Sequence, residues 1–230
     1  TTDTYYVSEI NLNGCESERT AVAVTMNIPA THLSFDGVND FIDLGTSSTL
    51  KPQFGLTVEF MAYHEDWSSI TNAATLIGNT QNGGYAIGVS GTNLSAVVRR
   101  NNSYGSVSKP LSQISAGWHH FALVYNGQYI GFYMDGVFVN SNNAGVFAPI
   151  TYSANNSTII GGESSGTAGV AENGRYFNGA IDEVKIWGYA RSYTELNRNK
   201  SCEIQGNESG LLAYYKFNQG IGAASNTAIT

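Results

Sequence analysis

The sequence predicts an all-β protein whose strands pack as a two-sheet sandwich or jelly roll, with one short helix near the C-terminal end. Short segments of strand type alternate with Gly, Asn, Asp and Ser over most of the 230 residues, which is typical of such folds. Two dipeptides suited to tight hairpins, Asn126-Gly127 and Asp135-Gly136, separate three of these segments, because both residues of each can take positive φ. One capping-box pattern, Ser192 followed three residues later by Glu195, indicates the helix.

The elements follow one another in a simple order. The first is a terminal hairpin, in which TYYVSEI and RTAVAVTMN alternate around a turn at Asn13-Gly14; it is too small to hold a core of its own. The linker IPAT follows, and from Thr31 the strand pattern becomes dense. The predicted strands are then HLSFDG, DFIDLG, LTVEFMAYH, ATLIGN, YAIGVSG, LSAVVRR, GWHHFALVYN, QYIGFYMDG, VFVN, STIIGGE and AIDEVKIWGY, followed by the helix SYTELNRN and the strand LLAYYKFN.

Composition limits the classes of function. Hydrophobic residues make up 42% of the chain, enough for a substantial core, whereas charged residues make up 13%, well below the usual fraction of about a quarter. A polar but uncharged surface of this kind is common in secreted β proteins. The net charge of -7 argues against nucleic-acid binding, since phosphate contacts need a surplus of Lys and Arg. No apolar run approaches the roughly 18 residues of a membrane span.

The two cysteines, Cys15 and Cys202, do not form a CxxC metal or redox motif. A disulfide between them would join the two ends of the chain and would imply export. The alternatives are two unpaired thiols, or a bond between Cys15 and a cysteine upstream. Because no signal peptide is visible at Thr1 and the chain stops at SNTAIT without a closing element, we expect a piece of a longer exported protein.

Four segments carry a resemblance to a known family: LSFDGVNDFIDLG, LTVEFMAY, GWHHFALVYNGQYIGFYMDGVFV and YFNGAIDEVKIWGYARSYTEL. In this order they resemble a laminin G-like domain of the concanavalin A-like lectin/glucanase superfamily over about residues 31–217. The resemblance implies two antiparallel sheets packed as a jelly roll. It also implies a place outside the cell or on its surface.

The ends of the chain resemble other parts of large, mosaic surface adhesins of the Bacteroidetes. Residues 1–28 resemble the last hairpin of an immunoglobulin-like module, or a linker. Residues 218–230 look like a truncated C-terminal extension. We therefore expect three parts, 1–28, 31–217 and 218–230, of which the middle one is the functional domain.

Two acidic segments suggest a calcium site. Calcium takes six to eight oxygen ligands, and Asp36 and Asn39 offer side-chain oxygens in a glycine-containing loop. In the family resembled, a strand like AIDEVKIW supplies an aspartate to a structural calcium, which implies Asp182 as the third ligand. Strand alternation would send Glu183 to the opposite, solvent face. The alternative is that Asp36 caps its own turn through an Asx-type hydrogen bond. Pentraxins, more distant relatives, place calcium in a loop equivalent to IIGGESSGTAG, where this chain lacks the further acidic groups.

Catalysis receives little support. Glycosidases need two carboxylates across one sugar bond, and the ExDxxE series of the related glucanases is missing from the chain. Glu59 or Glu65 would need an acid from another strand. His119 and His120 are adjacent, so on a strand they face opposite ways and cannot both hold one ion. We expect both to be structural.

Sugar binding needs aromatic platforms and hydrogen-bonding groups on an exposed face. The candidates are Tyr63, Trp67, Tyr85, Arg99, Asn101 and Tyr104, of which Trp67 is the most loop-like tryptophan, whereas Trp118 and Trp187 look like core residues. Together these features predict a non-catalytic, calcium-stabilised recognition or adhesion module for an extracellular glycan or surface protein. The alternatives are a structural spacer or protein-binding module without a sugar site and, third, a polysaccharide-active enzyme.

Overall fold

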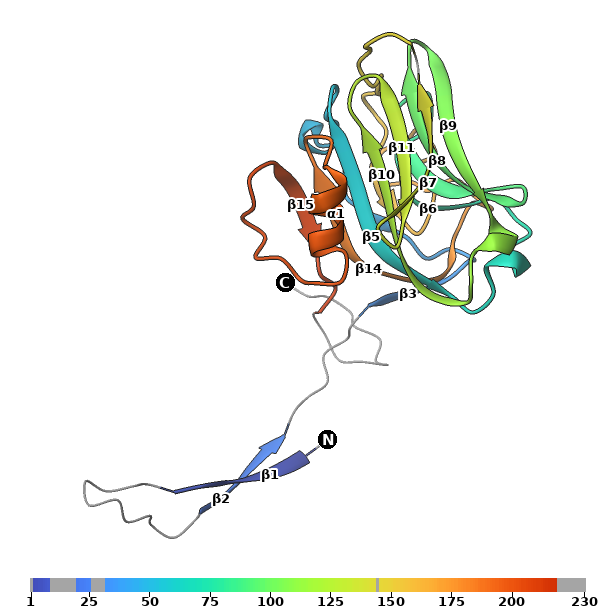
Figure 1. Cartoon of the computed structure of the whole chain (residues 1–230). Coiled ribbons are helices and arrows are strands. Elements are labelled where there is room, and N and C mark those ends of the chain that lie inside the picture. The colour runs from blue at the N-terminus through green and yellow to red at the C-terminus, as the bar shows by residue number, and fades with distance from the viewer. Residues whose placement is uncertain (1, 9–19, 26–31, 144, 219–230) are drawn as a thin grey trace. The chain divides into compact units, whose positions relative to one another are not determined.

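The computed structural model describes residues 2–8, 20–25, 32–143 and 145–218, and the chain divides into two compact units (Figure 1). The first unit contains the antiparallel strands β1 (Thr2–Val7) and β2 (Thr20–Thr25). The predicted turn at Asn13-Gly14 lies outside the described residues. The second unit spans His32–Phe217 and holds every other element.

The second unit is built on a seven-stranded antiparallel sheet. Its main path runs β12-β11-β10-β5-β14-β15, and β3 pairs with the first half of β14. The strands are β3 (Leu33–Asp36), β5 (Leu56–His64), β10 (Gly117–Tyr125), β11 (Tyr129–Met134), β12 (Val137–Asn143), β14 (Asn178–Trp187) and β15 (Leu211–Tyr215). The sequence-distant strands β5 and β14 are therefore neighbours at the centre of this sheet.

A six-stranded antiparallel sheet forms the other layer, in the order β4-β13-β6-β7-β8-β9. It contains β4 (Ile42–Asp43), β6 (Ala74–Gly78), β7 (Tyr85–Ser90), β8 (Asn93–Arg100), β9 (Ser103–Pro110) and β13 (Ile159–Ile160). Three short 3-10 helices, Ser48–Leu50, Trp67–Ser69 and Leu111–Gln113, lie in connections between strands. The two sheets confirm the predicted all-β sandwich.

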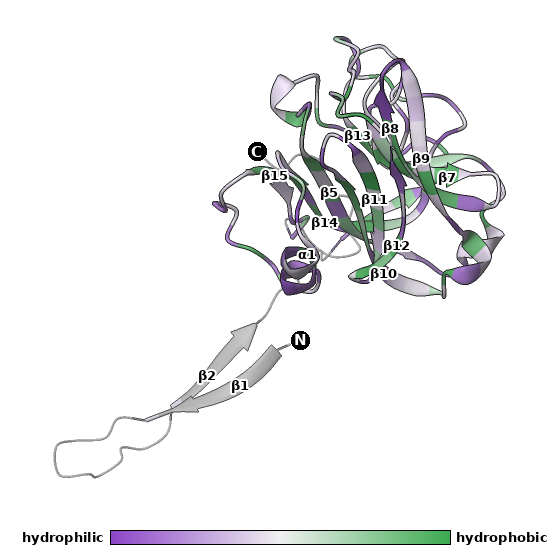
Figure 2. Cartoon of the chain, turned by 45° about the horizontal axis from the view of Figure 1, so that its top comes forward, coloured by the Kyte–Doolittle hydropathy of each residue, from purple (hydrophilic) through white to green (hydrophobic). Residues whose placement is uncertain are grey.

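The core fills the space between the sheets. Alternate residues of each strand point inward, as a pleated strand requires, and the largest fully buried side chains include Phe60, Tyr85, Phe121 and Phe132. Hydrophobic residues concentrate along the strands, whereas the helix is mostly hydrophilic (Figure 2). At about 25 cal/mol per Å² of apolar surface, burial of this many aromatic side chains is the main stabilising contribution.

The predicted helix is confirmed as α1 (Tyr193–Asn199), and the capping box of Ser192 and Glu195 is formed in both directions. The Asp135-Gly136 turn is also as predicted, with φ values of 53° and 75°. The Asn126-Gly127 prediction is wrong in detail. Strand β10 ends at Tyr125 and β11 begins at Tyr129, so residues 126–128 connect them, and the side chain of Asn126 accepts the amides of residues 128 and 129.

Strand β9 is absent from the sequence-based prediction because SYGSVSKP contains few β-branched residues and ends in proline. It is the edge strand of the six-stranded sheet, where Lys and Pro are tolerated because one side of the strand needs no partner. The turn before it is formed by Asn101 and Asn102, both with positive φ, 48° and 59°. This tight turn folds Tyr104 back beside Arg99 on β8.

Candidate functional site

A hollow of about 340 Å³ lies on the outer face of the six-stranded sheet, across strands β6 to β9. We call it the β6–β9 groove. Its floor is made of small side chains, Ala86 and Gly88 on β7 and Ser95 on β8. Their neighbours along the strands, Ile87 and Leu94, point into the core. The floor is low at these three positions because alternation sends Ile87 and Leu94 inward, while Val97 on β8 also lines the groove.

Gly88 cannot carry a larger side chain in this arrangement. A Cβ atom added there would lie 2.7 Å from the carbonyl oxygen of Ala74, well inside normal contact distance. The bulge between Thr75 and Ile77, where β6 shifts its register against β7, lies beside this position. The close approach of the two backbones therefore keeps the middle of the groove open.

One wall of the groove is the ring of Tyr104, which is 45% exposed. Its hydroxyl donates to the carbonyl oxygen of Thr80 and accepts the backbone N–H of Gly83 at 3.0 Å. Because both partners belong to the turn between β6 and β7, the ring is held in place while its apolar surface stays accessible. A fixed aromatic ring of this kind loses little entropy when a ligand packs against it.

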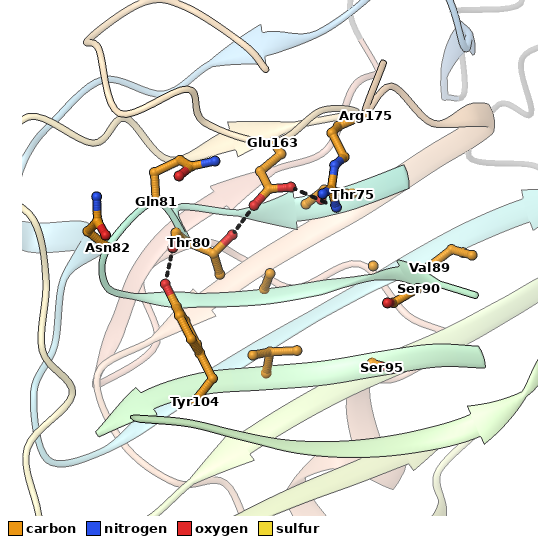
Figure 3. Close-up of a pocket in the computed structure, with 13 residues that line it drawn as sticks. Thr75, Thr80, Gln81, Asn82, Val89, Ser90, Ser95, Tyr104, Glu163 and Arg175 are labelled. Carbon is orange, nitrogen blue, oxygen red and sulfur yellow. Dashed lines mark hydrogen bonds and ion pairs between the residues drawn. The ribbon is translucent and has the colours of Figure 1, made fainter. Parts of the chain in front are cut away.

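A chain of polar contacts continues along the same wall (Figure 3). The hydroxyl of Thr80 donates to Oε1 of Glu163 at 2.9 Å, and Oε2 of Glu163 lies 3.4 Å from the guanidinium of Arg175. The Glu163 side chain is mostly buried, whereas that of Arg175 is about half exposed. Arg175 can therefore offer donors to a ligand while Glu163 orients it.

The turn that carries Thr80 also presents two amide side chains, Gln81 and Asn82, at the edge of the groove. The turn is rigid: the Asn79 side chain accepts the amide of Tyr85 at 3.0 Å and donates to Thr158 at 3.0 Å. Asn82 has a positive φ of 57°. The groove therefore has preorganised hydrogen-bonding groups beside an aromatic surface.

Arg99 on β8 lies opposite Tyr104 in the ladder with β9 and packs against its ring. Its guanidinium carbon lies 5.6 Å from the centre of the Tyr104 ring, within the range of a cation–π contact. Its Nε atom is buried and has no hydrogen-bond partner among the described residues. Arg99 is thus a positioning neighbour of Tyr104, and the two candidates predicted from sequence do come together.

The other predicted ligand residues lie elsewhere. Trp67 is fully buried and packs against Phe121 and Phe177, so its ring has no face open to a ligand. Tyr85 is also fully buried. Tyr63 is exposed but points outward from the seven-stranded sheet, in register with Trp118. Trp118, predicted as a core residue, is in fact 39% exposed.

The three predicted calcium ligands do not converge. Asp36 pairs with Asn178 in the β3–β14 ladder, so Asp182 lies four residues further along, roughly 13 Å away. Calcium ligands lie within 2.6 Å of the ion, so one ion cannot bind both carboxylates. Among the described residues, His, Cys, Asp and Glu side chains form no group of three that could hold a metal.

Asp36 instead caps its own turn, which is the alternative reading of the sequence. Its Oδ1 atom accepts the amides of Val38 at 2.8 Å and Asn39 at 3.3 Å, and its own amide donates to Asp40. The hydrogen bond from Val38 is the main reason why the pKa of Asp36 is below its ordinary value. The loop is satisfied internally by these contacts.

Asp182 and Glu183 depart from simple alternation because β14 contains a bulge at this point. Asp182 faces Met61 but Lys185 faces Glu59, so one extra residue is inserted, and Glu183 takes a positive φ of 53°. Glu183 does not point to solvent as predicted; it accepts the Tyr214 hydroxyl and pairs with Lys185 at 3.0 Å. Burial raises the pKa of Asp182 to about 7.

His119 and His120 are both buried and face opposite ways. Nδ1 of His119 lies 2.7 Å from Asp135, and Nε2 of His120 lies 3.1 Å from Glu59. Glu59 also binds Arg191 and accepts the indole N–H of Trp187 at 2.8 Å. Burial opposes the ionised form of Glu59, but His120 and Arg191 more than offset it and lower its pKa. Arg191 also donates to the carbonyl oxygen of Glu195 in α1 at 2.9 Å, so the Glu59 group links the helix to the sheet, whereas His119 packs against Trp67 and Phe121.

The disulfide stays a prediction, because Cys15 lies outside the described residues; Cys202 is exposed. Across the described part of the chain, no helix is long and apolar enough to cross a membrane.

Comparison with known proteins agrees with this fold. No curated protein matches the sequence. A heptameric SAP-like pentraxin from Limulus polyphemus has a TM-score of 0.58 at 17% identity, covering 86% of this chain and 98% of that chain. A putative carbohydrate-binding protein from Bacteroides ovatus has a TM-score of 0.62 at 19% identity, covering 92% of this chain and 58% of that chain.

A third similar structure is the CBM40 of the Ruminococcus gnavus IT-sialidase bound to α2,3-sialyllactose, with a TM-score of 0.55 at 12% identity, covering 74% of this chain and 96% of that chain. At these identities the likeness shows the fold alone. A laminin G family model, described as the concanavalin A-like lectin/glucanases superfamily, matches residues 20–197. This match covers more than half of the sequence, so the chain belongs to the concanavalin A-like lectin/glucanase superfamily.

Proposed function

We propose that this chain is a non-catalytic carbohydrate-binding module whose glycan lies in the β6–β9 groove. The observation that carries the proposal is the groove itself, with its small-residue floor, the fixed ring of Tyr104 and the polar chain of Thr80, Glu163 and Arg175.

A sugar ring has apolar C–H faces and a rim of hydroxyl groups, and this groove offers a partner for each. Tyr104 provides an aromatic surface, and sites of this kind combine such a surface with a few convergent polar groups. Gln81 and Asn82 can donate and accept at once, as vicinal hydroxyls require. Because Tyr104 and Glu163 are already held by neighbours, little conformational entropy is lost on binding.

The similar structures support this proposal by their names. One is called a putative carbohydrate-binding protein, and another holds α2,3-sialyllactose. Their identity to this chain is too low to transfer a ligand, so the kind of glycan rests on the groove alone.

Catalysis is disfavoured by the contents of the groove. Glycoside hydrolysis uses two carboxyl groups separated by about 5 to 10 Å. Among the described residues that line the groove, Glu163 is the one acid, and its oxygens already contact Thr80 and Arg175. Glu59, which the enzyme hypothesis would need, is buried in an ion network on the other sheet. We therefore propose binding without hydrolysis.

We further propose that the module is part of an exported surface protein and that it serves adhesion to polysaccharide. The low content of charged residues, 13%, is in keeping with this. One observation favours the second candidate, a spacer or protein-binding module. Phe54 and Phe147 are exposed and stack face to face, with ring centres 5.4 Å apart and an interplanar angle of 6°. An apolar pair of this kind suits a protein contact better than a sugar.

Isothermal titration of a glycan panel tests the main proposal. The wild-type chain should bind at least one oligosaccharide, and Tyr104→Ala and Glu163→Ala should each weaken it about tenfold or more. Tyr129→Ala is the matched control, since Tyr129 is 41% exposed and lies on the other sheet. If no glycan binds, or if the groove variants bind as well as the control, the groove is not a sugar site and the spacer hypothesis gains.

A further inference from the structure

The outer face of the seven-stranded sheet is only partly covered. Helix α1 packs there through Leu196, which contacts Ala122 and Val124 near the end of β10. Trp118 lies on the same face at the beginning of β10, because it is four positions before Ala122 on the same strand and alternate residues share a face. It remains 39% exposed. One end of this face is therefore covered by the helix, and the other end presents an aromatic surface.

Three rings from separate segments form that surface. Tyr63 on β5 is directly opposite Trp118 in the ladder and is 38% exposed. Their ring centres are 5.7 Å apart with the planes tilted by 50°. His32, just before β3, packs edge-on against Trp118 with ring centres 5.4 Å apart. The rings support one another, so the surface is fixed without being closed.

A hollow of about 370 Å³ adjoins these rings. His32 and Tyr63 line it, together with the polar side chains of Ser34, Glu65 and Asn178. Apolar ring faces beside a hydroxyl, a carboxylate and an amide form the same combination that the β6–β9 groove offers to a sugar.

Charge selects the class of ligand. Glu65 lies at this hollow, and the chain carries a net charge of -7, whereas the β6–β9 groove contains Arg175. A carboxylate beside the rings repels an acidic sugar and accepts hydrogen bonds from a neutral one. We propose that Trp118, Tyr63 and the adjoining hollow form a second glycan-binding surface, which takes a neutral oligosaccharide.

This second surface goes beyond the groove and does not depend on it. The groove is on the outer face of the six-stranded sheet and the aromatic surface is on the outer face of the seven-stranded sheet, so the sandwich separates them. One molecule can then bind two glycan chains at once, which raises the overall avidity although the affinity of each site is unchanged.

Tryptophan fluorescence isolates this surface. Of the three tryptophans in the chain, Trp67 and Trp187 are fully buried, so quenching by iodide reports on Trp118. The probes are cello-, xylo-, malto- and chito-oligosaccharides, with sialyllactose as the acidic comparison. At least one neutral probe should reduce the iodide quenching constant at least twofold, and sialyllactose should not.

Two variants of this surface and two controls show whether the protection of Trp118 comes from binding at this surface. Tyr63→Ala and Glu65→Ala should abolish the protection, whereas the groove variant Glu163→Ala and the control Tyr129→Ala should keep it; circular dichroism checks that each is folded. Absence of protection by every neutral probe overturns the second surface, as does protection that Glu163→Ala removes and Tyr63→Ala keeps. If Glu163→Ala abolishes glycan binding in calorimetry and no neutral probe protects Trp118, the groove binds glycan and the second surface does not. Protection of Trp118 by a neutral probe, with no glycan binding in the groove, supports the second surface and contradicts the groove function.

Discussion

Replacing Asp182 by asparagine should stabilise the protein at neutral and alkaline pH. Asp182 is half-buried at the bulge of β14, and burial is the main cause that raises its pKa from 3.8 to about 7, with Glu183 and Glu203 adding repulsion. The unfolded chain loses this proton near pH 4, whereas the folded chain keeps it until about pH 7. The folded state thus binds more protons in that window, and its stability falls as pH rises through it.

The magnitude follows from the size of the shift. About three pKa units correspond to about 4 kcal/mol, but a half-exposed carboxyl group is screened by solvent, so a cost on the order of 1–2 kcal/mol is realistic. Asparagine keeps the oxygen that accepts the amide of Glu183 and carries no charge at any pH. For a domain of this size, each kcal/mol shifts the melting temperature by roughly 2–4 °C.

Thermal unfolding followed by circular dichroism at pH 4, 6 and 8 measures the effect. Asp182→Asn should melt about 2–8 °C above the wild type at pH 8 and at nearly the same temperature at pH 4. The control Asp43→Asn removes an exposed aspartate and should change little at either pH. A lower melting temperature for Asp182→Asn at pH 8, together with lost stabilisation by calcium, would refute this reasoning and support the calcium site expected from the sequence.

Further predictions concern the buried residues. Glu59→Ala leaves Arg191 buried without its partner and should cost about 3–5 kcal/mol, measured by urea unfolding. Trp67→Ala should cost a similar amount by opening a cavity, yet should leave glycan affinity per folded molecule unchanged, since Trp67 has no exposed face. Gly88→Ala should lower the melting temperature and weaken glycan binding together, because the new Cβ atom would meet the carbonyl of Ala74.

Much of the fold could be predicted from the sequence because alternation and turn chemistry are local signals. The dense strand pattern from Thr31, the Asp135-Gly136 turn and the capping box at Ser192 all depend on residues close together in the chain. Strand β9 lacks the usual strand pattern because an edge position relaxes the residue preferences of a strand. The paired asparagines Asn101-Asn102 were the available signal, since both can take positive φ.

The site was harder to predict because it is assembled from distant segments. Tyr104 and Arg99 were identified as aromatic and basic candidates close together in sequence, and β8 and β9 bring them side by side. Glu163 and Arg175 lie in the long connection between β13 and β14, so no periodicity relates them to Thr80, which they approach in the fold. Trp67 does lie in a connection between strands, in the 3-10 helix Trp67–Ser69, as its polar neighbours indicate. Its side chain nevertheless packs inward, which the local sequence does not reveal.

The calcium ligands illustrate the limit of a resemblance. The sequence contains acidic residues in both expected segments, but the register of β3 against β14 separates Asp36 from Asp182 by four positions. Only the pairing of strands reveals that separation. The bulge that redirects Glu183 is likewise a property of the ladder between β14 and β5.

A crystal structure of the chain with an oligosaccharide that binds in calorimetry tests the central claim most directly. We predict sugar density in the β6–β9 groove, with one ring against Tyr104 and hydroxyl groups within 3.2 Å of Arg175 or Asn82. If crystals at saturating oligosaccharide show the sugar only away from Tyr104 and only solvent in the groove, the claim that the β6–β9 groove binds the glycan is wrong.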